Sequence, residues 1–541
     1  MTNMTETETI SDQETVRRLG GSDIGRCLTK IHHDRFTSGT RFEDDIRIRD
    51  IERGFEHETS VLSRIESIHP GLVRISDIGE AAAYATLAAM DDGAPIIVGG
   101  RFISDETYSA GAPDILVRLD DGYAPVEIKN HMVLGTSGIP ASVARLESIQ
   151  SGTGEPAKFR GNRRRDLYQV AHYRSLLLEA GYASDRALAG VVGSEDPYVC
   201  LWVDLSDGES PLWEEYQFHR RRTDNAIAFG RLHPDTPLEQ PWQRGQCARC
   251  DWEGLCRSQL VAVNDITLLT NVSSGERREL ASSGIRRIDQ IAGLEPGDPR
   301  VGNPSIVFQA RARTAQRLLR FTPAQELLHV PSAEIEVDFD IETYRGSIYL
   351  AGFLTTRDGS SVYEPIADWT GTHDGERKLV KEMFEKLAMI SRPQSLVLHW
   401  TDYEQRTLSE AGQRHQLSIP GYASVQDWFE QNAVDLCDWA RKSLVSPNGY
   451  SLKVVAPLSG FSWRDDDPGG RQSEIWFERF VQGDGGMRER LLQYNEDDVL
   501  AQLTIRQWLR DQDSGSGPGS AVPSVLDWPR NVPGSSVVGS A

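Results

Sequence analysis

The sequence predicts an α/β protein with two folded parts joined by a shorter helical segment. The length of 541 residues supports this division, because a compact domain averages about 150 residues. Hydrophobic residues make up 39% of the chain and charged residues 26%, a balance typical of soluble globular proteins. Strand-like and helix-like segments alternate over residues 18–260 and again over residues 333–511, without an internal repeat or a phosphate-binding P-loop.

Composition sets the remaining boundaries. Residues 1–17 are acidic and polar, and residues 512–541 are rich in Gly, Ser and Pro, so both segments are predicted to be disordered tails. Residues 261–332 form the predicted helical connector. The N-terminus lacks the basic and apolar regions of a signal peptide, and no stretch reaches the ~18 apolar residues of a membrane helix. We therefore expect a cytoplasmic protein with no membrane partner.

The net charge of −22 argues against a protein that binds nucleic acid by bulk positive charge alone. Basic residues are nevertheless concentrated at 158–165, at 219–222 and along 311–320. Each concentration is compatible with a solvated surface or with local contacts to phosphate groups, and the sequence leaves both interpretations open.

Two strand-like segments in the first part, 113–117 and 125–129, are joined by a short turn and predict a hairpin. Alternation places Glu127 and Lys129 on one face of the second strand, and the first strand starts at Asp114. Two carboxylates and a lysine would then converge at one edge of a sheet. Carboxylate oxygens suit Mg²⁺ or Mn²⁺, which polarise a phosphate and lower the pKa of a bound water.

Two further polar motifs occur in the first part. His57 lies in the segment Gly-Phe-Glu-His-Glu at 54–58, and Gln169 and Tyr173 lie four residues apart in a helical segment. The four-residue spacing places both side chains on one helix face. Taken alone, His57 is compatible with a surface position, and the Gln169 and Tyr173 pair is compatible with packing.

The cysteines are spaced as ligands rather than as a disulfide framework, which a cytosolic chain rarely uses. Cys247, Cys250 and Cys256 lie close together in the sequence, and Cys27 lies far upstream. The three C-terminal thiolates alone suit zinc about as well as an iron–sulfur cluster, and Cys27 would be the fourth ligand. The two other cysteines, Cys200 and Cys437, are predicted to be core residues.

The combination of these features resembles the PD-(D/E)xK nucleases, in particular the RecB-like members that carry an iron–sulfur cluster. The resemblance implies a restriction-endonuclease-like domain over 18–260 and a set of roles for the motif residues. These roles are Mg²⁺ or Mn²⁺ binding for His57, Asp114 and Glu127, assistance to the attacking water for Lys129, support of the site for Gln169 and Tyr173, and ligation of a structural 4Fe–4S cluster for Cys27, Cys247, Cys250 and Cys256, with Zn²⁺ as the alternative.

The second part begins with a strand that alternates strictly between acidic and apolar residues. Asp338, Asp340 and Glu342 share one face, and Phe339 and Ile341 share the other. A row of carboxylates on one strand face is unfavourable unless a cation or solvent offsets the charge. The segment therefore predicts either a metal site or a solvated acidic edge.

A helix near the end of this part carries Tyr494 and Asp498 four residues apart, on one face. Together with Asp340 and Glu342, this pair resembles the RNase H-like 3′–5′ exonucleases of the tyrosine-containing subclass. The middle motif of that family is best matched at 399–404, where Glu404 replaces the usual aspartate and Asp402 is the rival ligand. The resemblance implies that two metal ions are held by four carboxylates and that Tyr494 positions the attacking water; those carboxylates are Asp340, Glu342, Glu404 and Asp498. The alternative is an inactive RNase H-like scaffold.

The connector resembles a helix-hairpin-helix over 264–292. Leu280 would end one helix, Gly284 would form the turn, and Ile285 would begin the next apolar stripe. Such a turn contacts backbone phosphates in DNA-binding versions. A simple helical spacer is the alternative.

The whole arrangement resembles bacterial RecB-like nucleases that carry a C-terminal RNase H-like exonuclease domain, over residues 20–511. It implies a metal-dependent nuclease that hydrolyses phosphodiester bonds, with DNA favoured as substrate and repair or recombination as the setting. An RNA-directed exonuclease and a nucleic-acid-binding adaptor with degenerate sites are the alternatives. Without a P-loop, duplex unwinding would need a separate helicase as partner.

Overall fold

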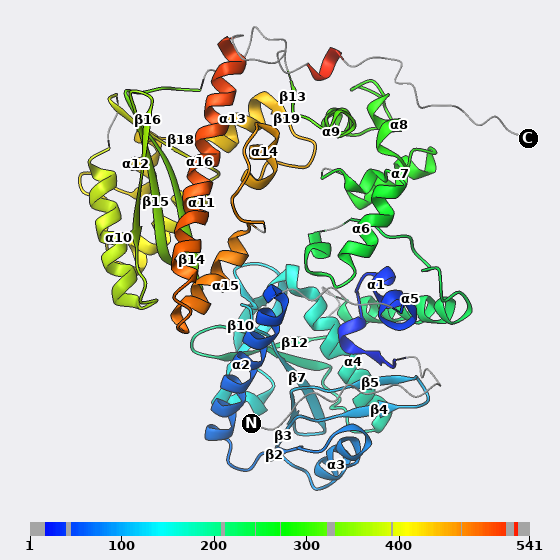
Figure 1. Ribbon diagram of the computed structural model, residues 1–541. Coiled ribbons are helices and arrows are strands. Elements are labelled where there is room, and N and C mark those ends of the chain that lie inside the picture. Colours follow the sequence, from blue (N-terminus) through cyan, green and yellow to red (C-terminus); the bar gives the residue numbers. More distant parts are fainter. Residues whose placement is uncertain are drawn as a thin grey trace, which may run out of the picture. The chain divides into compact units, whose positions relative to one another are not determined.

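The computed structural model describes residues 17–38, 45–206, 211–243, 245–270, 272–321, 330–390, 393–466, 468–514 and 524–527. The chain divides into two compact units, Met1–Cys256 and Arg257–Ala541 (Figure 1). Both units combine strands and helices, so the predicted α/β class is confirmed. Most of the two predicted tails lies outside the described residues.

The first unit contains a nine-stranded mixed sheet among its described residues, in the order β2-β3-β6-β7-β11-β12-β9-β10-β8. Its strands are β2 (Val73–Arg74), β3 (Ile96–Val98), β6 (Ile115–Arg118), β7 (Tyr123–Ile128), β8 (Leu134–Gly135), β9 (Ile139–Arg145), β10 (Glu155–Phe159), β11 (Leu188–Val192) and β12 (Val199–Asp204). A smaller sheet is formed by β1 (Leu19–Gly20), β4 (Phe102–Ser104) and β5 (Ser109–Gly111). The hairpin predicted from the sequence is the antiparallel pair β6–β7, in which Ile115 faces Val126.

The helices of the first unit are α1 (Leu28–Phe36), α2 (Asp45–Ile68), α3 (Gly79–Asp91), α4 (Arg164–Ala180) and α5 (Leu212–Leu232), and the division between the units falls within α6 (Glu253–Ala262). Helix α4 packs against β7 and β11. Its apolar residues Leu167, Val170 and Ala171 are fully buried in the core against the sheet. The anchored helix thereby holds its polar residues at a fixed position beside β7.

The second unit contains, among its described residues, a five-stranded sheet in the order β16-β15-β14-β17-β18. Its strands are β14 (Ile335–Tyr344), β15 (Ser347–Arg357), β16 (Ser360–Ala367), β17 (Ser395–His399) and β18 (Ala433–Asp435), and a small separate pair is β13 (Leu319–Arg320) with β19 (Leu444–Val445). Strands β14, β15 and β16 pair antiparallel with one another, whereas β17 pairs parallel with β14 and β18 pairs parallel with β17.

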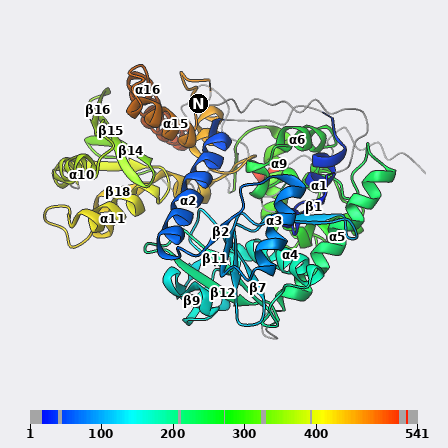
Figure 2. The same cartoon turned by 90° about the horizontal axis from the view of Figure 1, so that it is seen from below.

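Helices cover both faces of this sheet, as Figure 2 shows. They are α10 (His373–Ala388), α11 (Tyr403–His415) and α12 (Val425–Asn432) on one face, and α15 (Gly470–Val481) and α16 (Met487–Ser514) on the other, with α13 (Leu436–Ser443) and α14 (Leu452–Leu458) next to α16 and β17. Phe339 and Ile341 of β14 pack into the core beneath α10. The predicted alternation of β14 is therefore confirmed, and its acidic residues face α16.

The segment between the predicted domains contains α7 (Ser274–Ser282), α8 (Ile288–Ala292) and α9 (Pro304–Ala315). Gly284 adopts φ +76° between α7 and α8, and Ile285 and Ile288 are buried with Leu280 in one apolar cluster. Within the predicted C-terminal tail, Val525 is fully buried and its carbonyl accepts a hydrogen bond from an arginine of α9. This short turn therefore differs from the expected disorder.

The longest helices of the described residues, α2, α5 and α16, carry charged residues along their length. No helix in the described part of the chain combines the length and the apolar character that crossing a bilayer requires.

Candidate active sites

Strand β14 carries four acidic side chains on the face that contacts α16: Glu336, Asp338, Asp340 and Glu342. Helix α16 faces them with a row of residues spaced four apart, which places them on one side of the helix: Asp498, Gln502, Arg506 and Arg510. The contacts of these two rows divide the acidic face into two parts with different chemistry.

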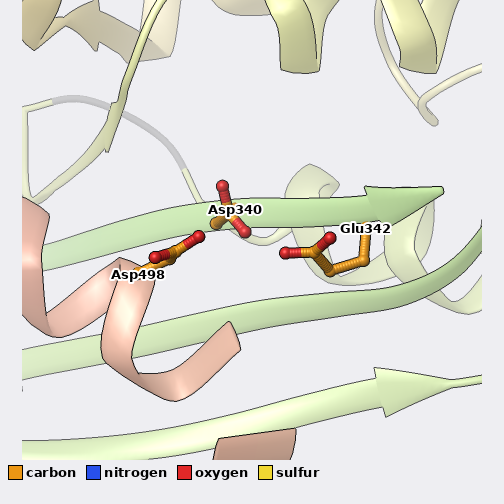
Figure 3. Close-up of side chains that lie close together, drawn as sticks. All are labelled: Asp340, Glu342 and Asp498. Atoms are coloured by element: carbon orange, nitrogen blue, oxygen red, sulfur yellow. The ribbon is translucent and has the colours of Figure 1, made fainter. Parts of the chain in front are cut away.

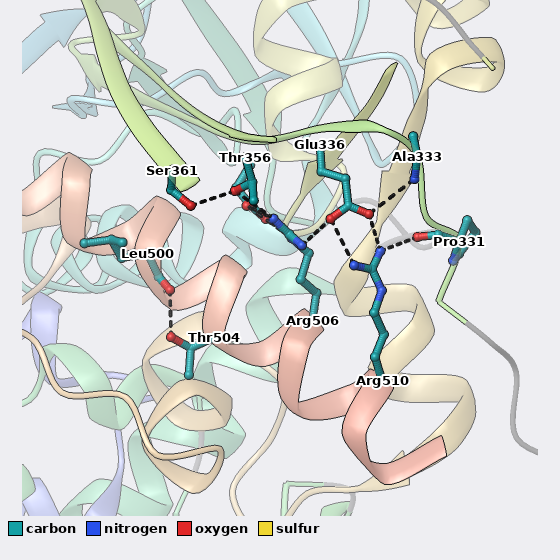
Figure 4. Close-up of polar contacts among 10 residues, drawn as sticks. Pro331, Ala333, Glu336, Thr356, Ser361, Leu500, Thr504, Arg506 and Arg510 are labelled. Atoms are coloured by element: carbon teal, nitrogen blue, oxygen red, sulfur yellow. Dashed lines mark hydrogen bonds and ion pairs between the residues drawn. The ribbon is translucent and has the colours of Figure 1, made fainter. Parts of the chain in front are cut away.

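The first part of the face is neutralised by arginines (Figure 4). Arg506 donates hydrogen bonds of 2.9 and 2.8 Å to the two carboxylate oxygens of Asp338, and both side chains are buried. Arg510 donates to Glu336 at 2.7 Å. These carboxylates have fixed cationic partners, so they are structural ion pairs.

In the second part of the face, no arginine pairs with the carboxylates among the described residues, and a third carboxylate joins them instead. Oxygen atoms of Asp340, Glu342 and Asp498 all lie within 4.8 Å of one another (Figure 3). Burial raises the pKa of Asp340 well above its usual range, and the charges of Glu342 and Asp498 raise it further. Burial and the nearby Asp498 also raise the pKa of Glu342 to about 8. A divalent cation would offset this repulsion, and hard oxygen ligands are the ones that Mg²⁺ and Mn²⁺ prefer.

Neutral donors hold the two strand carboxylates in place. Asn495 Nδ2 donates a 2.8 Å hydrogen bond to Asp340 Oδ2, and Tyr363 donates to Asn495 Oδ1 at 2.8 Å. Ser473 of α15 donates to Glu342 Oε2 at 2.7 Å. Since these donors carry no charge, they orient the carboxylates without neutralising them.

Asp498 has a different environment from the strand carboxylates. Its Oδ1 accepts a 2.7 Å hydrogen bond from Trp463 Nε1 and contacts the ammonium of Lys453. The ammonium lies 4.3 Å from the ring centre of Trp463 and 4.4 Å from that of Tyr494. Burial and the nearby Glu342 and Asp498 raise the pKa of Tyr494, so its phenol stays protonated and can donate a hydrogen bond.

The two acids of the middle motif differ in burial. Glu404 lies in the first turn of α11 and is 2% exposed, and its charge is one of those that raise the pKa of Asp340, after burial and the charges of Glu342 and Asp498. Its Oε2 lies 3.4 Å from His399 Nδ1. The Asp402 side chain is 79% exposed. Glu404 is therefore the buried acid near the carboxylate group, although it is not among the three residues whose oxygens lie within 4.8 Å of one another, and its role as a metal ligand stays a prediction.

In the first unit, β7 and α4 bring together the predicted lysine, glutamate, glutamine and tyrosine. Lys129 Nζ donates to Glu127 Oε1 and to Gln169 Oε1, both at 2.9 Å. Gln169 Nε2 donates to Glu127 at 2.6 Å and to the hydroxyl of Tyr173 at 2.8 Å. The four side chains form one connected polar network at the edge of β7.

Asp114 completes this cluster from the start of β6. Its Oδ2 accepts a 2.6 Å hydrogen bond from the backbone of Ile128. Burial, followed by the charge of Glu127, raises the pKa of Asp114 well above its usual range. Glu127 Oε2 is buried without a hydrogen-bond partner among the described residues. An unpaired buried carboxylate oxygen beside a second carboxylate fits a divalent cation.

Helix α2 places two neighbouring residues near this cluster. Burial lowers the pKa of His57, on which the Gly193 backbone, Glu195, His131 and the Lys129 backbone also act. Burial is the largest cause that raises the pKa of Asp114 and of Glu127. The charge of Glu58 makes a smaller contribution in the same direction to both. Glu58 is thus an acidic residue of the cluster that the sequence argument missed, although it lies in the same Gly-Phe-Glu-His-Glu segment.

The structure also brings the four predicted cluster cysteines together. Burial and the nearby thiols of Cys250, Cys27 and Cys247 raise the pKa of Cys256 to about 12. Cys27 directly precedes α1, and Trp252 Nε1 ties the C-terminal cysteine segment to an aspartate of that helix at 2.8 Å. Cys200 and Cys437 are buried in apolar clusters, as expected.

Residues 337–510 match the family model of the RNase_H superfamily. The match covers β14 to α16 and includes Asp340, Glu342, Glu404 and Asp498. The chain therefore contains an RNase H-like domain, as its motifs predict, and this family suggests a nuclease that acts on nucleic acid with Mg²⁺ or Mn²⁺ bound by acidic residues. Neither the curated proteins nor the solved structures give a match.

Proposed function

We propose that the RNase H-like domain is an active metal-dependent exonuclease, with DNA as the favoured substrate. The observation that carries this proposal is the division of the β14 face, where, among the described residues, Glu336 and Asp338 have arginine partners and Asp340 and Glu342 have none. Three carboxylates this close repel one another when ionised, which gives no benefit to a purely structural face but suits the binding of a divalent cation.

The residues of this site divide the work of phosphodiester hydrolysis. Asp340, Glu342, Glu404 and Asp498 would hold Mg²⁺ or Mn²⁺, which supplies Lewis-acid stabilisation of the phosphate when bound. Tyr494, protonated in its buried position, would orient the attacking water by a hydrogen bond. Lys453 would hold Asp498 in a fixed orientation.

The substitution of glutamate for aspartate in the middle motif is compatible with this activity. Glu404 is longer than aspartate by one methylene group, and it starts from the first turn of α11. Its carboxylate is buried, and its Oε2 lies 3.4 Å from His399 Nδ1, so His399 would hold this side chain in position as a ligand.

For the first unit we propose a second metal-dependent nuclease site of the PD-(D/E)xK type. The unpartnered Oε2 of Glu127 and the buried Asp114 support a metal site, and Lys129 lies 2.9 Å from Glu127, where its charge would stabilise the attacked phosphate. Gln169 and Tyr173 would hold the lysine and the glutamate in position.

The four clustered cysteines would bind a 4Fe–4S cluster with a structural role. A tetrahedral zinc site with Zn–S bonds of about 2.3 Å would place the sulfurs about 3.8 Å apart. The structure does not distinguish these sulfur separations, so zinc stays the alternative to the cluster. Anaerobic purification with iron and zinc analysis tests this directly. We expect about four irons per chain, and a Cys27→Ser variant should lose both the iron and the visible absorbance; one zinc per chain would contradict the cluster.

The setting of DNA repair or recombination extends this proposal. The turn at Gly284 between α7 and α8 would contact the phosphate backbone of the substrate. Unwinding of duplex DNA would come from a separate helicase, since the sequence contains no P-loop.

Nucleotide release from labelled DNA and RNA strands of one sequence, with Mn²⁺, tests both sites in the full chain. Asp340→Asn should remove the activity of the RNase H-like domain, Glu127→Gln that of the first unit, and the double variant should be inactive. Asp402→Asn is the matched control, because this carboxylate is 79% exposed beside the same motif. A wild-type chain that binds strand ends without releasing nucleotides would support the adaptor alternative, and equal or faster release from RNA would support the RNA exonuclease.

A further inference from the structure

A groove without acidic residues lies at the edge of the large sheet in the first unit. It has a volume of about 1130 Å³ and is lined by residues of 132–143 and 156–162, which belong to or adjoin β8, β9 and β10. The lining includes Lys158 and Arg160 but, among the described residues, no aspartate or glutamate. This is unusual in a chain with 80 acidic and 58 basic residues. The groove therefore has the charge expected for an anionic ligand.

A short segment of chain connects the groove with the candidate metal site of the first unit. Met132 lines the groove and follows Lys129 by three residues, and the carbonyl of Lys129 accepts a 2.8 Å hydrogen bond from the backbone of His131. The His131 ring contacts Asp166 at 2.9 Å. Burial and Lys129 have the largest effects on the pKa of Glu127, and the charge of Asp166 raises this pKa by a smaller amount. A polymer lying in the groove would thus reach the carboxylate cluster without leaving the surface of this unit.

The basic residues of the groove differ in their freedom to bind. Arg160 is tied to the hairpin, because its Nε donates to the carbonyl of Leu134 at 2.8 Å. Lys158 is exposed on β10 and has no ion-pair partner among the described residues. Lys158 is therefore the basic residue of the groove that is free to bind a phosphate group.

Apolar side chains in the same groove indicate which form of nucleic acid fits. Met132 is 48% exposed and Leu134 is 36% exposed, and both line the groove. A duplex keeps its bases stacked inside, whereas a single strand offers its bases to apolar and aromatic surfaces. Exposed apolar groups beside unpaired cations therefore match a single strand better than a duplex.

We propose that this groove binds a single strand of nucleic acid, independently of its sequence, and guides the strand to the carboxylates of the first unit. The inference rests on the proposed nuclease function of that unit. Lys158 would contact a phosphate group, and Met132 and Leu134 would contact bases.

Binding of fluorescein-labelled oligothymidylate to the full chain, measured by anisotropy in EDTA, tests the groove without cleavage. Lys158→Glu should weaken binding by about tenfold and reduce the slope of log K against log salt by about 0.7 per lost phosphate contact. Met132→Ala should weaken binding without changing the salt slope. Lys378→Glu is the matched control, because this exposed lysine lies on α10, on the sheet face opposite the second acidic cluster. Circular dichroism establishes that each variant is folded.

The outcomes separate the groove from the nuclease proposal. Unchanged affinity of Lys158→Glu overturns the groove as the binding site, whether or not the wild-type chain cleaves DNA. An equal loss of affinity for a duplex of the same length overturns the single-strand assignment. If Lys158→Glu weakens strand binding while Glu127→Gln leaves nucleotide release unchanged, the groove stands and the nuclease function of the first unit fails.

Discussion

Arg506 and Asp338 form a buried ion pair, with Nη2 2.8 Å from Oδ2, two residues along β14 from the first carboxylate of the metal cluster. The same helix therefore brings a cation to Asp338 and a third acid, Asp498, to Asp340. Because the two contacts share one helix and one strand, the ion pair fixes the position at which Asp498 meets the strand carboxylates.

Replacing Arg506 should accordingly destabilise the second unit and its site together. Arg506→Met leaves the carboxylate of Asp338 buried without a partner, which costs about 3–5 kcal/mol of unfolding free energy. Urea unfolding of the full chain, followed by hydrogen exchange of β14, measures this loss. The double variant Arg506→Met with Asp338→Leu should recover most of it, since no unpaired charge remains. A loss below about 1 kcal/mol, the range of exposed ion pairs, would contradict the structural role.

The sequence predicts the two strand–helix motifs because their signals are local. Alternation in β14 and the four-residue spacing of Tyr494 and Asp498 each depend on neighbouring residues, and both agree with the structure. The pairing of Arg506 with Asp338 spans 168 residues and leaves no local signal. The sequence therefore could not separate Asp338 from the metal cluster.

The sequence alone also could not rank the two acids at the start of α11, Asp402 and Glu404. They differ in burial, because Glu404 is 2% exposed and the Asp402 side chain is 79% exposed, and this difference depends on the tertiary fold. The sequence motif points to His57, and the nearness of Glu58 to Asp114 and Glu127 depends on how α2 packs in the fold, which leaves no local signal.

A glycine of β15 controls the orientation of Asp340. A Cβ at Gly352 would lie 2.9 Å from Asn495 Cγ and still closer to Oδ1, so Gly352→Ala must displace the amide that donates to Asp340. Supporting partners of metal ligands typically contribute about 10–100-fold in metal affinity. We expect a Mn²⁺ affinity lower by about that factor, measured by calorimetry in a Glu127→Gln background that silences the first unit. Gly470→Ala, where a Cβ meets nothing within 4 Å, should bind Mn²⁺ like the parent.

The stability of the metal-free second unit should fall as the pH rises. The pKa of Glu342 is raised from 4.5 to about 8 by burial and by Asp498, so the folded state binds more protons than the unfolded state in this interval. The stability that protonated Glu342 provides is complete below about pH 4.5 and is lost as the pH passes about 8. Thermal melting in EDTA should therefore give a lower Tm at pH 8.5 than at pH 6.

Added Mn²⁺ should raise the Tm more at pH 8.5 than at pH 6, because the metal ion competes with protons for the same oxygens. Glu342→Gln carries no titrating group at this position and should flatten both trends. A Tm that is independent of pH in the wild-type chain would show that the cluster carboxylates ionise normally.

Glu58 and His57 make different predictions for the metal site of the first unit. Glu58 is close enough to raise the pKa of Asp114 and Glu127 in the metal-free state, so its charge belongs to the cluster that would bind the cation. His57 instead carries no negative charge, and burial lowers the pKa of its ring. In an Asp340→Asn background, Glu58→Gln should therefore lower the Mn²⁺ affinity by about tenfold or more. A tenfold change corresponds to about 1.4 kcal/mol of binding free energy, which is the expected effect of removing one close negative charge. His57→Gln should lower it less, and the reverse order would identify His57 as the ligand that the sequence motif implies.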